Sequence, residues 1–238
     1  MSSPQIEPFT GFRREAIQFL ADLAANNERA WFQPRKAQYE ALLRRPLEAL
    51  VAALAERFAA RGVPLTADPA RSPFRIYRDT RFSKDKSPYK TNISASFPWS
   101  GDAPGAAGGE GPDRHGVGGY FPLSPGEIYV GGGMWHPEPA RLAAFRAAVI
   151  ADPATLHRAI DEPGFVAAFG TVHGDELKRV PPGFQADHPD AALLRLKDVT
   201  FGRRLADEDA LSARLPDVIA GSFAAALPVL RLLSALRS

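Results

Sequence analysis

Apolar residues repeat every three or four positions through the first sixty residues, the spacing of amphipathic helices. One stripe follows Thr10, a residue type that caps helix N-termini well, and the helical region 28–61 carries another. Pro34 and Pro46 should divide that region into two or three pieces, because proline disrupts a helix beyond its first turn. Gly62 stands where a left-handed C-cap belongs. The stripes are Phe12, Ala16, Phe19, Leu20 and Leu23, then Leu47, Leu50, Val51, Leu54 and Phe58.

The hydrophobic period changes to two in the middle of the chain, which predicts half-buried strands over 74–82 and 91–97. In the second strand, Ile93, Ala95 and Phe97 should face the core, with Asn92, Ser94 and Ser96 on the other side. Tyr120–Leu123 and Glu127–Val130 flank Ser-Pro-Gly, which predicts a hairpin whose second strand continues through Gly131-Gly132-Gly133. Residues 193–201 are ambiguous between strand and helix, and Val199, Thr200 and Phe201 favour strand.

Helical spacing returns after Pro139, and Asp152-Pro153 predicts the start of a further helix. The last helix should kink at Pro228; its stripe is Ile219, Phe223, Ala226, Leu230 and Leu233. Helices thus precede and follow a central group of strands. This order predicts one α+β domain over 1–238, with a mainly antiparallel sheet, helices packed on one face, and helical N- and C-terminal segments.

Composition narrows the class of protein. The 238 residues are 45% hydrophobic and 24% charged, which is typical of a globular domain with a substantial core. The chain has no cysteine, so disulfides, thiolate metal sites and thiol nucleophiles are excluded. We find neither a long uncharged apolar run nor a signal-peptide pattern, and we therefore expect a cytoplasmic protein without a membrane partner. Residues 100–119 hold eight glycines and two prolines, which predicts a flexible loop.

Charge is concentrated in residues 74–92. Six basic side chains against two acidic ones give this segment +4, while the formal net charge of the whole chain is +2. A strand over 74–82 would place Arg75, Tyr77, Asp79 and Arg81 on one face, with Phe74, Ile76 and Phe82 toward the core. Arginine grips phosphate or carboxylate bidentately, and lysine acts as a point charge. The predicted ligand-binding residues are Arg75, Tyr77, Arg78, Arg81, Ser83, Lys84, Lys86, Tyr89 and Lys90.

A structural interpretation of the same segment stands beside the binding one. Asp79 and Asp85 would pair with arginines inside the segment, and the lysines would only be solvated, as charge runs usually are. Arg195 and Lys197 would extend the positive site if their segment is a strand.

Histidines and acidic residues give weaker evidence for a functional site than the basic segment does. The five histidines are scattered, without metal-binding spacing or cysteine partners. A metal site built from His136, His188, Asp187 and Asp190 is the alternative to surface histidines; we predict no metal and no cofactor. Catalytic carboxylates cannot be chosen among 27 acidic residues without geometry.

The block Phe-Arg-Ile-Tyr-Arg-Asp-Thr-Arg-Phe-Ser-Lys-Asp-Lys-Ser-Pro-Tyr-Lys-Thr-Asn at 74–92 resembles the hallmark of an uncharacterised family, domain of unknown function 2461. The resemblance extends over most of the chain and implies no activity or catalytic residue. It also includes Asn26-Asn27, Trp31-Phe32, Gly131-Gly132-Gly133, Pro182-Gly183-Phe184 and Asp187-His188-Pro189.

Three functions remain open from the sequence. The first is binding of a phosphate-bearing ligand, a nucleotide or a nucleic-acid backbone, at 75–92. The second is an enzyme that holds an anionic substrate there, with a proton-transfer group from 127–136 or 187–190 nearby. The third is a structural or interaction module whose arginines are buried salt-bridge struts. The sequence leaves the ligand, the reaction and the oligomeric state undetermined.

Overall fold

The computed structural model describes residues 6–81, 83–100 and 116–236. Its centre is a four-stranded antiparallel sheet in the order β1-β2-β3-β4. The strands are β1 (Ile93–Pro98), β2 (Val117–Ser124), β3 (Glu127–Met134) and β4 (Val199–Arg204). The predicted hairpin is confirmed, because β2 and β3 pair directly around a turn at Pro125-Gly126. The predicted α+β fold class is therefore confirmed.

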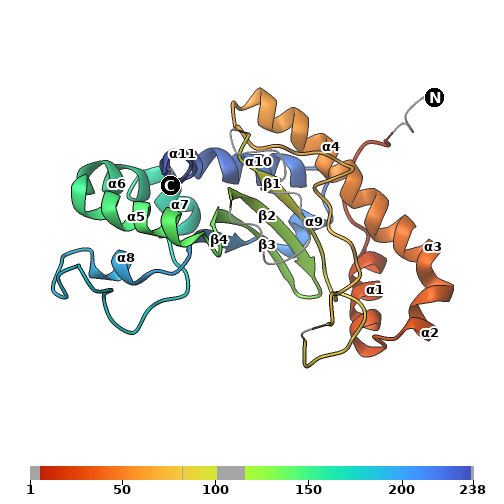
Figure 1. Cartoon of the computed structure of the whole chain (residues 1–238). Helices are drawn as coiled ribbons and strands as arrows, with labels where there is room; N and C mark the ends of the chain where they lie inside the picture. The colour runs from red at the N-terminus through yellow and green to blue at the C-terminus, as the bar shows by residue number, and fades with distance from the viewer. Residues whose placement is uncertain (1–5, 82, 101–115, 237–238) are drawn as a thin grey trace.

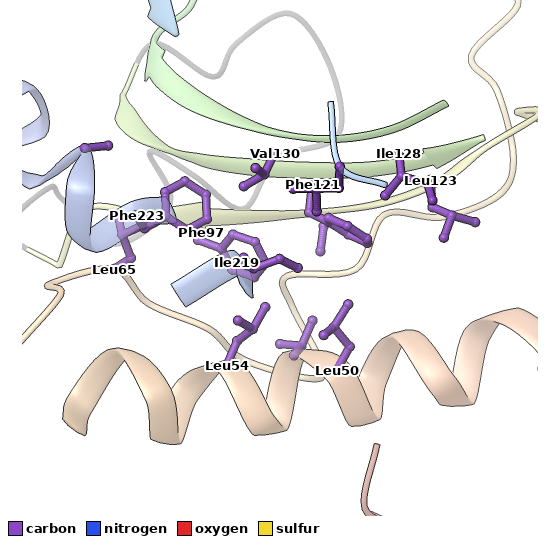
Figure 2. Packing of buried hydrophobic residues seen from close by; sticks show 14 of the residues in the cluster. Leu50, Leu54, Leu65, Phe97, Phe121, Leu123, Ile128, Val130, Ile219 and Phe223 are labelled. Atoms are coloured by element: carbon purple, nitrogen blue, oxygen red, sulfur yellow. The ribbon is translucent and has the colours of Figure 1, made fainter. Parts of the chain in front are cut away.

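One face of the sheet is covered by helices α4 (Arg45–Ala60), α10 (Leu215–Ala225) and α11 (Leu227–Ala235), as Figure 1 shows. Helix α4 contacts β1 and α10, and α11 contacts β2 and β3. Figure 2 shows the core between these layers, where the predicted stripe of α4 meets strand side chains. Fully buried members are Leu50, Leu54, Phe97, Phe121, Val130, Ile219 and Phe223.

The N-terminal helices are divided as predicted at the prolines. After α1 (Arg14–Ala25) come α2 (Arg29–Phe32), a 3₁₀ turn (Gln33–Arg35), α3 (Lys36–Tyr39) and a π-helical turn (Glu40–Arg44) that runs into α4. Pro34 lies in the 3₁₀ turn and Pro46 in the first turn of α4, and Gly62 has the expected positive φ of 62°.

The prediction that Thr10 caps the first helix is wrong. The helix begins at Arg14, because the preceding residues pack against the segment around Ala210 instead. The Phe12 N–H donates to the Ala210 carbonyl at 2.8 Å. Gly11 has φ of 102°, and a Cβ there would lie 2.3 Å from the Leu211 carbonyl oxygen.

A second group of helices lies at the other end of the sheet: α5 (Pro139–Ala151), α6 (Pro153–Ile160), α7 (Pro163–Phe169) and α8 (Ala191–Arg195). Asp152 caps α6 as predicted, because its carboxylate accepts the Thr155 N–H at 3.0 Å. The short α9 (Asp207–Ala210) leads back toward α10. Helices α10 and α11 meet at a 55° bend, which confirms the kink expected at Pro228.

Residues 193–201 contain both a helix and a strand, the two structures that the sequence pattern left open. Residues up to Arg195 are helical, and the strand starts only at Val199. Arg195 and Lys197 therefore do not share a strand face. Arg195 Nε lies 3.2 Å from Glu176, and Lys197 Nζ lies 3.7 Å from Asp175, so both cations pair locally and do not extend the basic segment.

One further boundary differs from the prediction. Val117, Gly118 and Gly119 belong to β2 and not to the predicted loop, of which residues 101–115 lie outside the described residues.

Within the part of the chain that the structure describes, no single helix is long and apolar enough to cross a membrane. The bent pair α10 and α11 would be long and apolar enough only if both helices are counted together.

Candidate functional site

The segment 72–92 runs beside β1 but is not a regular strand, so the predicted strand over 74–82 is wrong. Pro73 and Pro88 have no N–H, which prevents a continuous ladder. Isolated bridges join Pro73 to Ala95 and Tyr77 to Tyr89. The ribbon is held by Ser96 N–H to Ser72 O (3.0 Å), Phe74 N–H to Ser94 O (2.9 Å), Lys90 N–H to Ile76 O (2.7 Å) and Arg78 N–H to Pro88 O (2.9 Å).

The two sides of this ribbon differ in length. One residue separates Phe74 from Ile76, whereas three residues separate their partners Lys90 and Ser94. Thr91 and Asn92 are therefore extra, and they bulge out of the ribbon. Among the hydrogen bonds of the described residues, none uses the backbone N–H of Thr91 or Asn92. The bulge thus presents two backbone donors.

A polar hollow of about 490 Å³ lies at this bulge. It is lined by residues of the ribbon together with the end of α1, namely Ala24, Asn27, Arg78, Asp85, Ser87, Tyr89, Lys90, Thr91 and Asn92. Three of the predicted ligand-binding residues therefore meet here: Arg78, Tyr89 and Lys90. The structure adds Asn27, Thr91 and Asn92, which carry no charge and were not in the predicted set.

The other predicted residues are not among those that line the hollow. Tyr77 is 45% exposed on the outer side of the ribbon. Arg75, Arg81, Lys84 and Lys86 are exposed and Ser83 is half-buried, and the Lys86 ammonium donates to the Thr80 carbonyl at 2.9 Å. The basic residues therefore do not form one face. Phe82 lies outside the described residues.

Asp79 and Asp85 each pair with an arginine of the segment, as the structural interpretation expected. The Arg81 guanidinium contacts Asp79 at 2.7 Å, and its hydrogen bonds lower the pKa of Asp79 to about 2. Asp85 pairs with Arg78 and accepts from Ser87; the Ser87 hydrogen bonds and then Arg78 lower its pKa. Arg81 is not a buried strut, since its side chain is 78% exposed, whereas the Arg78 side chain is 27% exposed.

The ring of Tyr89 is buried and packs inside the protein. It stacks on Phe32 with centroids 4.2 Å apart, and Tyr77 covers it at 5.5 Å. Tyr39 packs on the other side of Phe32, and burial raises its pKa to about 12. Because Tyr89 is only 1% exposed, its ring is not available for stacking on a ligand. The aromatic cluster instead supports the hollow.

Asn27 connects this ribbon to the N-terminal helices. Its side-chain amide donates to the Tyr89 carbonyl at 2.9 Å, and its side-chain oxygen accepts the Tyr89 N–H at 3.0 Å. Both bonds are partly buried and span 62 residues of sequence. Sequence reasoning missed this role, because a single asparagine after a helix is typical of a helix end. The Asn26-Asn27 pair within the family resemblance was the available signal.

We expect Asn27→Ala to lower the free energy of unfolding by about 1–3 kcal/mol, since it leaves two partly buried backbone groups unpaired. Chemical denaturation measures this loss. Asn26→Ala is the matched control, because Asn26 makes an exposed hydrogen bond to Asp22 within its own helix end. An equal loss in both variants would show that Asn27 does not hold the ribbon in place.

A second hollow, the sheet cleft, lies on the sheet face opposite the helices and has a volume of about 630 Å³. Gly118, Gly131 and Gly133, which lie on neighbouring strands, contribute backbone to its floor, and the Tyr129 ring lies over Gly131. Four aromatic residues form its walls: Phe74, Tyr120, Tyr129 and Trp135. The sheet cleft and the polar hollow share Lys90 and Asn92.

Small polar residues and one cation complete the sheet cleft. Asn92, Ser94, Ser96 and Thr200 line it, and Ser94 and Ser96 alternate away from the core, as predicted. Lys90 is the only charged residue among its described lining residues. Its ammonium lies 4.9 Å from the centroid of the Phe74 ring, a cation–π distance. Burial raises the pKa of Tyr129, so its hydroxyl remains protonated at neutral pH.

The histidines that the structure describes are not gathered into a cluster with metal-binding geometry. Within residues 6–81, 83–100 and 116–236, no group of three His, Asp or Glu side chains is arranged to hold a metal ion. His188 Nδ1 accepts the Asp190 N–H, and Asp190 contacts His157 Nε2 at 2.8 Å. Asp161 contacts His157 Nδ1, and hydrogen bonds to Asp161 and Asp190 raise the His157 pKa. This cluster belongs to the helices at the far end of the sheet (Figure 1).

Of the two segments expected to supply a proton-transfer group, only 127–136 reaches the sheet cleft, through Tyr129 and Trp135. His136 follows Trp135 with an unusual positive φ of 46°, and its N–H donates to the buried Asp198 carboxylate at 2.5 Å. His136 is not among the residues that line either hollow.

Comparison with known proteins agrees with the resemblance of the 74–92 block. The model of a family described as "Conserved hypothetical protein (DUF2461)" matches residues 15–231. All residues that line the polar hollow and the sheet cleft fall inside this range. No curated protein and no solved structure matches the chain. Because the family model covers most of its length, the chain belongs to the DUF2461 family of conserved hypothetical proteins.

Proposed function

We propose that this protein binds a small ligand through a phosphate or similar oxyanion in the polar hollow. One observation carries the proposal: Lys90 lines the same hollow as Thr91 and Asn92, whose backbone N–H groups make no hydrogen bond among those of the described residues. Successive backbone N–H groups in an irregular turn are a common way to hold an anion. Lysine adds a point charge.

The charge of the polar hollow favours an anion. Among the described lining residues, Arg78 and Lys90 supply two positive charges and Asp85 supplies one negative charge. Asp85 is occupied by Arg78 and by the Ser87 hydroxyl. The described lining residues therefore carry a net positive charge, which a bound anion would offset.

The concave shape favours a small molecule over a nucleic-acid backbone. Arg81, Lys84 and Lys86, which a long polyanion would also contact, are exposed outside the hollow, and Arg81 is already paired with Asp79. A hollow of this volume falls within the usual range for small-molecule sites, which is roughly 300–1,000 Å³.

Thermal unfolding with inorganic phosphate tests the proposal. Phosphate replaces chloride at constant ionic strength, and the melting temperatures of wild type, Lys90→Ala and Arg81→Ala are compared. At about 100 times its dissociation constant, phosphate should stabilise the wild type by about 2.7 kcal/mol, a shift on the order of 5 °C or more. Arg81→Ala, the matched control, should retain the shift, and Lys90→Ala should lose it.

Two results would contradict this function. One is a wild type that does not respond to phosphate; the other is an equal response in all three proteins, which would indicate a nonspecific salt effect. Binding of single-stranded oligonucleotides that weakens steeply with salt, and that Arg81→Ala reduces as much as Lys90→Ala, would assign the exposed basic residues to a nucleic acid instead.

A further inference from the structure

The floor of the sheet cleft is suited to a flat group. Gly118 pairs with Gly133, and Gly131 pairs with Gly202, so side chains are absent from adjacent positions of β2, β3 and β4. Tyr129 lies across two of these glycines, because a Cβ added at Gly202 would lie 1.8 Å from its hydroxyl oxygen and one at Gly131 would lie 2.7 Å from its ring. The Tyr129 ring therefore covers the backbone at Gly131 and Gly202, and it adds an aromatic surface to the sheet cleft.

The walls of the sheet cleft are aromatic. Phe74 and Tyr120 meet edge to face with centroids 6.0 Å apart. Trp135, at the end of β3, is 55% exposed although it carries the largest apolar side chain type in the chain. Aromatic side chains on the open face of an antiparallel sheet provide stacking surfaces for the planar rings of bases, because every base has a π-face.

The chemistry of the lining distinguishes classes of ring. The described lining residues of the sheet cleft include no carboxylate, and the polar groups are the neutral side chains of Asn92, Ser94, Ser96 and Thr200. Amide and hydroxyl groups both donate and accept hydrogen bonds, so they can pair with the ring nitrogens and carbonyl oxygens of a heterocycle. A few such groups in an apolar site fix the orientation of the ligand.

Lys90 and Asn92 line both hollows, so one molecule can occupy both. We propose that the sheet cleft binds a planar heteroaromatic base, and that this base and the oxyanion in the polar hollow belong to one ligand, a nucleoside monophosphate. This inference rests on the proposed function, because it assigns the phosphate to the polar hollow. Asn92 then lies between base and phosphate, and Lys90 balances the phosphate charge beside the Phe74 ring.

Isothermal titration calorimetry of the full chain separates the contributions of base and phosphate. The probes are inorganic phosphate, ribose 5-phosphate, the nucleosides adenosine, guanosine, cytidine and uridine, and the 5′-monophosphates of these four nucleosides. At least one of the four nucleotides should bind ten-fold or more tightly than ribose 5-phosphate, because stacking of one base on aromatic side chains accounts for factors of about 5 to 150.

Two variants locate the base. Trp135→Ala should weaken that nucleotide about ten-fold while leaving ribose 5-phosphate unchanged. Ile150→Ala is the matched control, because Ile150 is also an exposed apolar residue, 44% exposed, but does not line the sheet cleft. It should leave the affinity of the nucleotide unchanged. Both side chains are exposed, so both variants should fold, which circular dichroism verifies.

The outcomes separate this inference from the proposed function. If ribose 5-phosphate binds through Lys90 and no nucleotide exceeds it, the base site is wrong and the anion site stands. A loss of nucleotide affinity in Ile150→Ala but not in Trp135→Ala also overturns the base site. If nucleosides bind as tightly as their monophosphates, base and phosphate do not belong to one ligand. If no phosphate compound binds, the proposed function itself fails.

Discussion

Replacing Phe223 with alanine is expected to lower the free energy of unfolding by about 3–5 kcal/mol, the cost of a large cavity in a packed core. Phe223 on α10 is fully buried. Its ring meets Phe58 of α4 at 5.8 Å and Phe97 of β1 at 6.0 Å, both edge to face. It therefore joins α4 and α10 to the sheet; Figure 2 shows Phe223 beside Phe97. Denaturant unfolding monitored by circular dichroism measures the loss.

Gly119 makes this prediction more specific. It lies on the core side of β2, and a Cβ there would lie 2.4 Å from the Phe223 ring. Gly119→Ala alone should therefore destabilise the protein, because a tightly packed ring has no room to move. In the Phe223→Ala variant, the methyl group of an alanine at position 119 can enter the cavity that the ring leaves. Gly119→Ala should there lower the free energy of unfolding little, or even raise it.

A double-mutant cycle over Gly119 and Phe223 tests this coupling, which should reach about 1–3 kcal/mol between residues in contact. Val166→Ala is a control for simple loss of apolar side chain, since Val166 is 42% exposed and should change stability by no more than about 0.5 kcal/mol. Strictly additive effects of the two core changes would show that the ring and Gly119 are not in contact.

The helical layer was predictable because its information is local. Leu50, Leu54 and Phe58 recur at the helical period and are buried on one side of α4. The same holds for Ile219 and Phe223 on α10. A period of 3.6 residues needs no knowledge of the partner surface, so the core of this layer follows from spacing alone.

The course of residues 72–92 was not predictable, because the alternation of apolar and polar residues in a short segment does not determine its backbone hydrogen bonds to a neighbouring strand. Ile76 is buried and Tyr77 is exposed, as the pattern indicated. The partner segment, however, contains Pro88 and two extra residues, and the resulting bulge interrupts the pairing. Where a bulge forms depends on the pairing of both sides, which the pattern of one side does not contain.

The candidate site was only partly predictable for a related reason. The charge of 74–92 drew attention to Arg78 and Lys90, which line the polar hollow, but charge alone could not tell them from Arg81 or Lys84, which lie outside both hollows. The sheet cleft depends on glycines of different strands that become neighbours only through pairing register. In the sequence, Gly131-Gly132-Gly133 indicates close packing as readily as a ligand.

Gly133→Ala is expected to lower the free energy of unfolding by about 3 kcal/mol or more, through two effects at one position. Gly133 has φ of 115°, a conformation that is essentially restricted to glycine. A Cβ there would also lie 2.3 Å from the Val199 carbonyl oxygen and 2.8 Å from Thr200 Cα. Backbone atoms of a paired strand cannot yield as a flexible side chain does, so β3 and β4 must separate locally.

Gly126→Ala distinguishes the two effects. Gly126 in the β2–β3 turn also has a positive φ, 72°, but nothing lies within 4 Å of an added Cβ. This variant should therefore show only the conformational cost, about 1–2 kcal/mol. The difference between the two variants in denaturant unfolding measures the clash between β3 and β4. Because Gly133 and Thr200 both belong to the sheet cleft, Gly133→Ala should also abolish the gain in affinity that a base provides, whereas Gly126→Ala should retain it. Equal stability of the two variants would mean that β4 does not lie as close to Gly133 as the floor of the sheet cleft requires.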